Sequence, residues 1–418
     1  MNLLKQRENN FHIIAKPSGP LCNLDCHYCF YTEKEALFPG QPSYKMSDVT
    51  LENFVSNYIK SQKAPEIPFV WQGGEPTLMG LDFYKKVVQF QKKYAGDKKI
   101  SNSLQTNGTL LDDEWCEFLS ANDFLVGISI DGPPDVHDYY RVNRGGKPTS
   151  DQVLRGLSLL LKYDVSYNVL TCVTKESAPR ALEIYRYFKE KGVRYLQFIP
   201  IVERLPDTKA LQLGLRHATP PSLTQSEVQK AVSPWTVGPE QYGDFLIEVF
   251  EEWVRKDVGR VHVMNFEWAL AAWLGLPSPI CLFSETCGNA GIIEHTGDVY
   301  SCDHFMYPDY KLGNITKDSL KKMMSSIEQK EFGNVKRDTL PNQCRSCEVR
   351  FACHGECPKH RFLLSDDGET GLNYLCTGYK KYFSHIHRYM KVIVQLLEHN
   401  LPASDIMKVI KGPLVVRN

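Results

Sequence analysis

The sequence has no excess of charge of either sign and no apolar run long enough to cross a membrane. Lys and Arg together number 49, as do Asp and Glu, so the overall charge favours neither nucleic acid nor an acidic membrane as a partner. The longest apolar stretch, residues 268–276, is less than half of a membrane-spanning helix. The first ten residues are polar and lack the apolar core of a signal peptide. These absences predict a cytoplasmic protein that binds neither nucleic acid nor membrane.

Cysteine is abundant, with thirteen in 418 residues. In a secreted chain this number would indicate disulfide bonds, but without a signal peptide we expect metal binding or catalysis. Eleven of the thirteen fall in two groups, within residues 22–29 and 281–376. The other two, Cys116 and Cys172, lie within periodic helix and strand patterns, which predicts that they are small buried apolar side chains.

The first cysteine group reads Cys22-x3-Cys26-x2-Cys29 and follows an apolar run at residues 11–15. Thiolates are suitable ligands for iron–sulfur clusters and for zinc. Three of them leave one coordination position open, as in catalytic rather than structural metal sites. Spacing alone therefore allows two interpretations. One is a cluster with an open iron, and the other is zinc with His27 or a distant residue as the fourth ligand.

Short apolar runs alternate with amphipathic segments from residue 11 to residue 200, and apolar side chains follow helical spacing in residues 51–59 and 153–161. This alternation predicts a parallel sheet with crossover helices. Six strand–helix units fall short of the eight in a closed barrel. We therefore expect an α/β fold with a partial (βα)6 TIM-type barrel. Its strands are predicted at residues 11–15, 67–72, 100–106, 124–131, 166–173 and 194–199.

Polar motifs follow several of these predicted strands. The cysteines follow the first strand, and Gly73-Gly74-Glu75-Pro76 follows the second. The third ends in Gln105-Thr106-Asn107-Gly108 and the fourth in Ser129-Ile130-Asp131-Gly132. Each motif alone is an ordinary turn sequence. Because the carboxyl ends of barrel strands meet at one mouth, the motifs together predict a single active site there.

The length of the chain suggests two or three domains, or one large α/β unit with an appendage. We predict the barrel in residues 1–240, a cluster-binding domain in residues 241–378 and a helical segment in residues 379–418. Residues 203–240 are rich in proline, which predicts either a surface linker or a lid over the barrel mouth.

Eight thiols make up the second cysteine group, and eight satisfy two [4Fe–4S] clusters with four ligands each. Because Cys-x2-Cys occurs in both iron–sulfur and zinc sites, a pair of zinc ribbons is the alternative interpretation. The eight are Cys281, Cys287, Cys302, Cys344, Cys347, Cys353, Cys357 and Cys376.

The first cysteine motif with the following Phe30-Tyr31, together with Gly73-Gly74-Glu75-Pro76, resembles the signatures of radical S-adenosylmethionine (SAM) enzymes. In that family SAM chelates the open iron of a [4Fe–4S] cluster through its amino and carboxylate groups. The resemblance favours the cluster over zinc. It implies that SAM contacts come from Tyr31, Gly73, Gly74, Glu75, Gln105, Ser129, Arg141 and Val202.

The second cysteine group resembles the SPASM domain of peptide-modifying radical SAM enzymes, which implies three [4Fe–4S] clusters in all. By that resemblance one auxiliary cluster is held by Cys281, Cys287, Cys302 and Cys357. The other is held by Cys344, Cys347, Cys353 and Cys376.

The chain also resembles the anaerobic sulfatase-maturating enzymes nearly end to end, for example in residues 71–77, 131–134 and 301–305. That family converts a Cys or Ser in a Cys/Ser-x-Pro/Ala-x-Arg motif of a sulfatase to Cα-formylglycine (3-oxoalanine). The resemblance implies that a 5′-deoxyadenosyl radical abstracts the Cβ hydrogen, that Asp303 is the base and that the auxiliary clusters take the electron. The implied partners are an unfolded or nascent sulfatase polypeptide and a reducing protein such as flavodoxin or ferredoxin.

Two other functions are left open by the sequence. One is a different SPASM peptide maturase, which forms a thioether or modifies a cofactor precursor. Such enzymes often carry an N-terminal recognition domain, and only about ten residues precede the first predicted strand. The other is a non-catalytic iron–sulfur electron carrier, which would need neither the Gly73–Pro76 motif nor Arg141.

Overall fold

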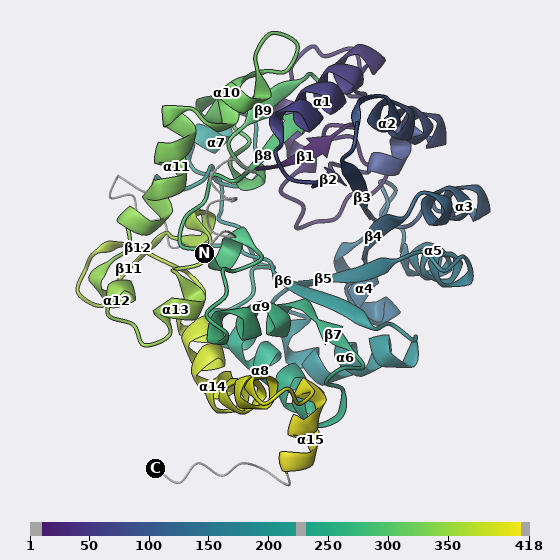
Figure 1. Cartoon of the computed structure of the whole chain (residues 1–418). Coiled ribbons are helices and arrows are strands. Elements are labelled where there is room, and N and C mark those ends of the chain that lie inside the picture. The colour runs from purple at the N-terminus through teal and green to yellow at the C-terminus, as the bar shows by residue number, and fades with distance from the viewer. Residues whose placement is uncertain (1–10, 223–230, 411–418) are drawn as a thin grey trace.

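A ten-stranded sheet forms the centre of the protein, in the order β10-β9-β8-β1-β2-β3-β4-β5-β6-β7. The computed structural model describes residues 11–222 and 231–410. Strands β1 to β7 are all parallel. In Figure 1 they form an open arc with helices along its outer side. The strands of the sheet are β1 (His12–Lys16), β2 (Glu66–Trp71), β3 (Lys99–Thr106), β4 (Phe124–Ser129), β5 (Tyr167–Val173), β6 (Tyr195–Pro200), β7 (His262–Val263), β8 (Ala290–Glu294), β9 (Asp298–Tyr300) and β10 (Lys311–Asn314).

All six predicted strands are present, with ends within two residues of the predicted ones, and the partial barrel is confirmed. Two additions come from the C-terminal part of the chain. Strand β7 extends the sheet beyond β6, and β8 pairs in parallel with β1 at the other edge. A small separate hairpin is formed by β11 (Leu363–Leu364) and β12 (Thr370–Leu372).

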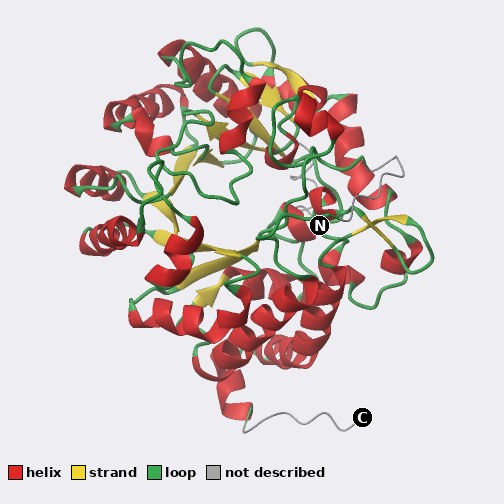
Figure 2. Ribbon diagram, turned by 180° about the vertical axis from the view of Figure 1, so that it is seen from behind, coloured by secondary structure: helices red, strands yellow, loops and turns green. Residues whose placement is uncertain are grey.

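Fifteen α-helices occur in the described residues, and Figure 2 shows how they surround the sheet. They are α1 (Asp48–Ser61), α2 (Leu81–Tyr94), α3 (Asp113–Ala121), α4 (Pro134–Tyr140), α5 (Ser150–Lys162), α6 (Ala181–Glu190), α7 (Thr208–Gln212), α8 (Pro239–Lys256), α9 (Met264–Trp273), α10 (Leu320–Met324), α11 (Ile327–Asp338), α12 (Asn342–Arg345), α13 (Arg350–Cys353), α14 (Cys376–Glu398) and α15 (Ile406–Val409).

Helix α1 illustrates how the outer layer is built. The side chain of Ser47 accepts a hydrogen bond from the backbone N–H of Thr50 and so caps the first turn. On the inner face Phe54 and Tyr58 are fully buried and contact Phe69 of β2 through ring pairs 5.0–5.7 Å apart. The helical spacing that predicted this element therefore marks the face that packs on the sheet.

The sheet crosses the predicted boundary at residue 240, because β7 to β10 belong to it. Helix α14 begins at Cys376 and packs along α8, so it joins the C-terminal part to the barrel. The division into residues 1–240, 241–378 and 379–418 stays a prediction.

Residues 203–222 and 231–240 are packed against other parts of the chain, unlike a solvent-exposed linker. Ala210 of α7 and Leu215 are buried against Tyr307, which belongs to the C-terminal part. The predicted absence of a signal peptide concerns residues 1–10, which lie outside the described residues, as do residues 223–230 of the proline-rich segment. Among the helices that the structure describes, none has the length and apolar character needed to cross a membrane.

Candidate functional site

The loop with the first three cysteines lies at the carboxyl end of β1, against the motif that follows β2. The backbone N–H of Gly74 donates to the Gly19 carbonyl and that of Glu75 donates to the Leu21 carbonyl, both at 2.8 Å. A Cβ atom at Gly74 would lie 2.1 Å from the Leu21 carbonyl oxygen. Glycine is therefore required there, because the two loops touch backbone to backbone.

Glu75 is fully buried, and its carboxylate joins the turn after β2 to the end of β3 through hydrogen bonds. One oxygen accepts from the Thr77 backbone N–H at 3.0 Å and from the Thr106 hydroxyl at 2.7 Å. The other accepts from the backbone N–H of Asn107 at 2.7 Å. The carboxylate thus has a structural role in addition to its predicted role toward SAM.

Cys22, Cys26 and Cys29 are brought together by this loop, and their thiols lie close enough to interact electrostatically. Two other predicted SAM contacts meet at the adjoining strand ends, where the Gln105 side-chain amide donates to the Ser129 hydroxyl at 3.1 Å.

Arg141 is buried beside the cysteine loop rather than exposed on the surface. Its Nε atom lies 2.9 Å from Asp131 Oδ2, and the two side chains are 9% and 4% exposed. Asp131 also accepts hydrogen bonds from the Tyr28 hydroxyl and from the Cys172 backbone N–H. The Arg141 guanidinium donates to the Cys172 sulfur at 3.5 Å. Although burial opposes it, Asp131 holds the pKa of Arg141 above its usual value.

Cys172 was predicted to be a small buried apolar side chain. Instead it is only partly buried and lies among mouth residues at the end of β5, where its sulfur accepts from Arg141. Cys116, by contrast, is fully buried among apolar side chains, as predicted.

The eight C-terminal cysteines form two electrostatically coupled groups, and no disulfide occurs among the described cysteines. One group consists of Cys281, Cys287, Cys302 and Cys357. The other consists of Cys344, Cys347, Cys353 and Cys376. In the described part of the chain no three His, Cys, Asp or Glu side chains converge tightly enough to hold a single metal ion.

Two buried cations lie beside these thiols. Lys336 is fully buried and Arg361 is 2% exposed. Both donate to backbone carbonyls, and neither has an ion pair with a carboxylate in the described residues. A buried charge without a counter-charge is costly. Anionic clusters held by the two cysteine groups would supply that counter-charge, so the donor set and its surroundings fit the predicted cofactors.

Asp303 lies in a 3₁₀ helix, Asp303–Phe305, directly after Cys302. Its carboxylate forms an ion pair with Lys16 at the end of β1, at 2.6 Å. Burial alone would raise the pKa of Asp303, but the nearby Lys16 holds it below its usual value. The Lys16 ammonium also donates to the Gln72 side chain at 3.3 Å and lies 4.4 Å from the centre of the Tyr31 ring. Asp303 is therefore a carboxylate held between the barrel mouth and an auxiliary cysteine group.

Tyr31 donates its hydroxyl hydrogen bond to Glu294 of β8, at 2.5 Å. This predicted SAM contact is thus joined to the C-terminal part of the chain, and its role toward SAM stays a prediction.

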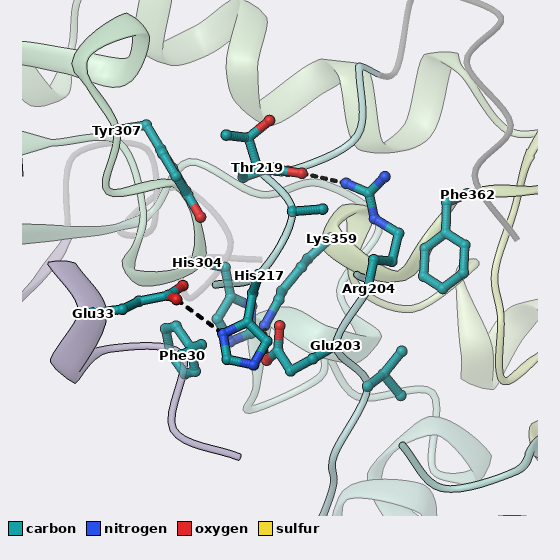
Figure 3. A pocket seen from close by; sticks show the side chains of 13 residues that line it. Phe30, Glu33, Glu203, Arg204, His217, Thr219, His304, Tyr307, Lys359 and Phe362 are labelled. Atoms are coloured by element: carbon teal, nitrogen blue, oxygen red, sulfur yellow. Dashed lines mark hydrogen bonds and ion pairs between the residues drawn. The ribbon is translucent and has the colours of Figure 1, made fainter. Parts of the chain in front are cut away.

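A cavity of about 10 Å³, room for about one water molecule, lies where the cysteine loop, the 203–222 segment and the C-terminal part meet. Figure 3 shows His217 directed toward Glu33, with Nδ1 3.1 Å from Oε2. Lys359 and Glu203 form an ion pair at 2.5 Å on the same side. Val202 also lines this cavity and is buried. The 203–222 segment therefore lines one side of this cavity, and its role as a lid stays a prediction.

Sequence reasoning missed Lys16, Glu294 and the position of Cys172. Lys16 had one available signal, because it is the last residue of β1 and charged residues at the carboxyl ends of barrel strands point to the site. Nothing in the sequence indicated the contact of Glu294 with Tyr31, since the two are 263 residues apart.

Comparisons with known proteins agree with this geometry. Residues 17–188 match the family model of the radical SAM superfamily, and residues 285–348 match that of an iron–sulfur cluster-binding domain. The chain is 46% identical to the serine-type anaerobic sulfatase-maturating enzyme of Bacteroides thetaiotaomicron, over 96% of this chain and 95% of that protein. It is 33% identical to a cysteine-type anaerobic sulfatase-maturating enzyme of Clostridium perfringens, over 89% and 95%.

A solved structure of anSMEcpe with bound AdoMet and the Cp18Cys peptide matches with a TM-score of 0.79 and 32% identity, over 92% of this chain and 99% of that one. SuiB from Streptococcus suis, bound to S-adenosylmethionine, shares the fold at a TM-score of 0.57 and 13% identity. The chain therefore belongs to the anaerobic sulfatase-maturating enzymes, within the radical SAM superfamily.

Proposed function

We propose that this oxidoreductase converts the Cys or Ser of a Cys/Ser-x-Pro/Ala-x-Arg motif in a sulfatase polypeptide to Cα-formylglycine, with Asp303 as the general base. The observation that carries the proposal is the place of Asp303. It follows a predicted cluster ligand, Cys302, and is paired at 2.6 Å with Lys16 at the barrel mouth. A base there can reach a substrate bound in the mouth while it lies beside the site where an electron is removed.

We propose that the three cysteine groups hold the three clusters and that SAM is bound by the contacts that the sequence analysis predicts. When bound, SAM and the clusters supply the one-electron chemistry of the reaction. The protein's own residues orient the base and accept the proton from the substrate. Lys16 orients the Asp303 carboxylate, and Asp303 accepts the proton from the thiol or hydroxyl of the substrate. The segment of residues 203–222 contributes Glu203, His217 and Thr219 to the lining of the small cavity beside the mouth.

The test is Asp303→Asn in anaerobically reconstituted enzyme with SAM, a reductant and an unstructured peptide that carries the motif. A serine peptide is the first choice, because the 46% identical relative is serine-type, and a cysteine peptide runs beside it. A general base contributes about 10²–10⁴-fold to rate. We expect the variant to form formylglycine at least about 100-fold more slowly, measured by mass spectrometry.

Two measurements separate loss of the base from loss of the site. Iron content and cleavage of SAM to 5′-deoxyadenosine should be retained, because Asn keeps the shape of Asp303 and is not a cluster ligand. Formation of formylglycine near the wild-type rate would show that the base lies elsewhere.

The reductant and the compartment belong to the proposal as well. A reducing protein such as flavodoxin or ferredoxin would supply electrons, and the substrate would be an unfolded or nascent chain in the cytoplasm. Both points rest on the family resemblance. Reconstitution of turnover with purified flavodoxin in place of a chemical reductant tests the first.

A further inference from the structure

His304 stands next to the proposed base and contacts two of the cysteine regions. It follows Asp303 in the same 3₁₀ helix and is half-buried. On one side its Nδ1 atom lies 3.3 Å from the sulfur of Cys357. On the other side its ring meets the Phe30 ring edge to face, with centroids 5.6 Å apart (Figure 3). Phe30 directly follows Cys29, so His304 lies between the loop of the first cysteine group and an auxiliary group.

The turn that carries His304 is fixed at the residues on both sides. Asp303 forms an ion pair with Lys16 at 2.6 Å. Phe305 is buried and meets the Phe332 ring edge to face, with centroids 5.1 Å apart. Because this short turn is held at both neighbours, the direction of the His304 side chain toward the cysteine sulfur follows from the fold.

The hydrogen bond between His304 and Cys357 has one possible direction when Cys357 is a cluster ligand. A thiolate that binds iron carries no proton, so it can only accept a hydrogen bond. A neutral imidazole in this contact must carry its proton on Nδ1 and donate it to the sulfur. The cluster therefore also fixes the tautomer of His304.

Two carboxylates lie next to this cysteine group. Asp303 directly follows Cys302, and the fully buried Glu356 directly precedes Cys357. Negative charge beside a cluster disfavours the more negative reduced state, so both carboxylates lower its reduction potential. A hydrogen bond to a ligand sulfur has the opposite effect, because it stabilises the negative charge there. His304 can thus oppose the carboxylates without placing a positive charge beside the proposed base.

We propose that His304 is a positioning residue, which donates a hydrogen bond to Cys357 and raises the reduction potential of the cluster at this cysteine group. In the proposed reaction of a serine substrate, the radical left after removal of the Cβ hydrogen loses its hydroxyl proton to Asp303 and one electron to this cluster. The products are the aldehyde and a cluster reduced by one electron, and a higher potential favours this step. The kinetic consequence rests on the proposed function, whereas the contact with the cluster does not.

The test compares two variants of the reconstituted holoenzyme. His304→Phe keeps an aromatic ring against Phe30 but removes the donor, and His304→Asn can donate from the position of Nδ1. Each protein is titrated anaerobically and followed by EPR. For His304→Phe we expect the ratio of oxidised to reduced cluster at a fixed potential to rise about tenfold, which is about 59 mV for one electron. His304→Asn should restore most of that shift.

The other two clusters are internal controls, and their potentials should not move. The control variant is His262→Phe, which replaces a histidine of β7 at the opposite edge of the sheet from β10, whereas His304 lies between β9 and β10 in the chain. It should leave all three potentials unchanged. An unchanged potential in His304→Phe, or an equal shift of all three clusters, would overturn the proposal.

A measurement on the wild-type protein covers the case in which His304→Phe loses this cluster. With isotopically labelled histidine, pulsed EPR of the reduced protein should show a histidine nitrogen weakly coupled to an auxiliary cluster. That coupling should disappear in His304→Asn. Absence of the coupling from wild type, or its persistence in His304→Asn, would show that His304 does not bond to the ligand sulfur.

Kinetics separates failure of this role from failure of the proposed function. His304→Phe should lower kcat for formylglycine about tenfold or more, with SAM cleavage and KM for the peptide unchanged. A lowered potential with unchanged kcat would overturn the part of His304 in the reaction. If wild-type enzyme forms no formylglycine, the proposed function is wrong, and the potentials still decide whether His304 acts on the cluster.

Discussion

The buried ion pair of Arg141 and Asp131 supports the loop of the first cysteine group, and its loss should be measurable as stability. In Arg141→Met, Asp131 keeps two hydrogen bonds, from the Tyr28 hydroxyl and the Cys172 N–H, but loses its only cation among the described residues. Removing one partner of a buried pair costs about 3–5 kcal/mol, because the remaining charge is left uncompensated.

For a chain of 418 residues the entropy of unfolding is about 0.9 kcal/mol/K, so this loss corresponds to a Tm lower by about 3–6 °C. Calorimetry of the anaerobically reconstituted protein measures it. The control is Arg141→Met/Asp131→Asn, in which neither charge is left. It should lose less than the sum of the two single variants by at least about 1.5 kcal/mol.

Arg141→Lys separates stability from SAM binding. Lysine keeps the charge, but its single nitrogen cannot take the positions of both Nε, which donates to Asp131, and Nη2, which donates to the Cys172 sulfur. Because Arg141 is also a predicted SAM contact, loss of one charged hydrogen bond to SAM, worth about 1.5–3 kcal/mol, should lower SAM affinity by about tenfold or more. A Tm of Arg141→Met within about 1 °C of wild type, or unchanged SAM affinity of Arg141→Lys, would refute this reasoning.

Three further predictions concern the cysteine groups and the joint between α8 and α14. Replacement of Cys22, Cys26 and Cys29 together by Ala should abolish SAM cleavage and leave about two-thirds of the iron by chemical assay, and loss of all iron from a folded variant would contradict three separate clusters. Arg361→Met should lower the reduction potentials of the auxiliary clusters but not of the barrel cluster in an EPR-monitored titration, since a buried cation favours the more negative reduced state; equal shifts would contradict a local effect. Glu251 accepts hydrogen bonds from His385 and Tyr389 of α14, which, against the effect of burial, lower its pKa to about 2. The contribution of Glu251 to the free energy of unfolding is complete above its unfolded pKa of about 4.3 and is lost only as the pH falls toward 2. Glu251→Gln should therefore lower Tm by about 1–3 °C equally at pH 7.5 and 9. A change in Tm that differs between these two pH values would contradict this reasoning.

Much of the barrel could be predicted because its signals are local. The strand at residues 67–72 and the helix at residues 51–59 each carry a periodicity that their own burial requires, so the predicted ends lie within three residues of the observed ones. The mouth was predictable for the same reason, since polar motifs directly follow strands whose carboxyl ends must meet.

What the sequence could not give are contacts between distant residues. No local sequence pattern assigns β8 to the edge of the barrel beside β1, because the paired residues His12 and Ala290 are 278 positions apart in the chain. The ion pair of Lys16 with Asp303 and the hydrogen bond of Arg141 to Cys172 depend on such tertiary placement. A proline-rich composition likewise does not say whether residues 203–222 are solvated or packed.

The pairing of β1 with β8 explains why the C-terminal part continues the barrel sheet instead of forming a separate body. In this pairing Lys16 lies opposite Glu294, so the end of β1 and the end of β8 are held at one level. Lys16 then reaches Asp303, and Tyr31 of the cysteine loop reaches Glu294. A slip of one residue would move the two parts by about 3.3 Å and turn their side chains to opposite faces. A substrate residue must lie within reach of both the barrel site and Asp303, so the register of this strand pair fixes the distance on which the proposed reaction depends.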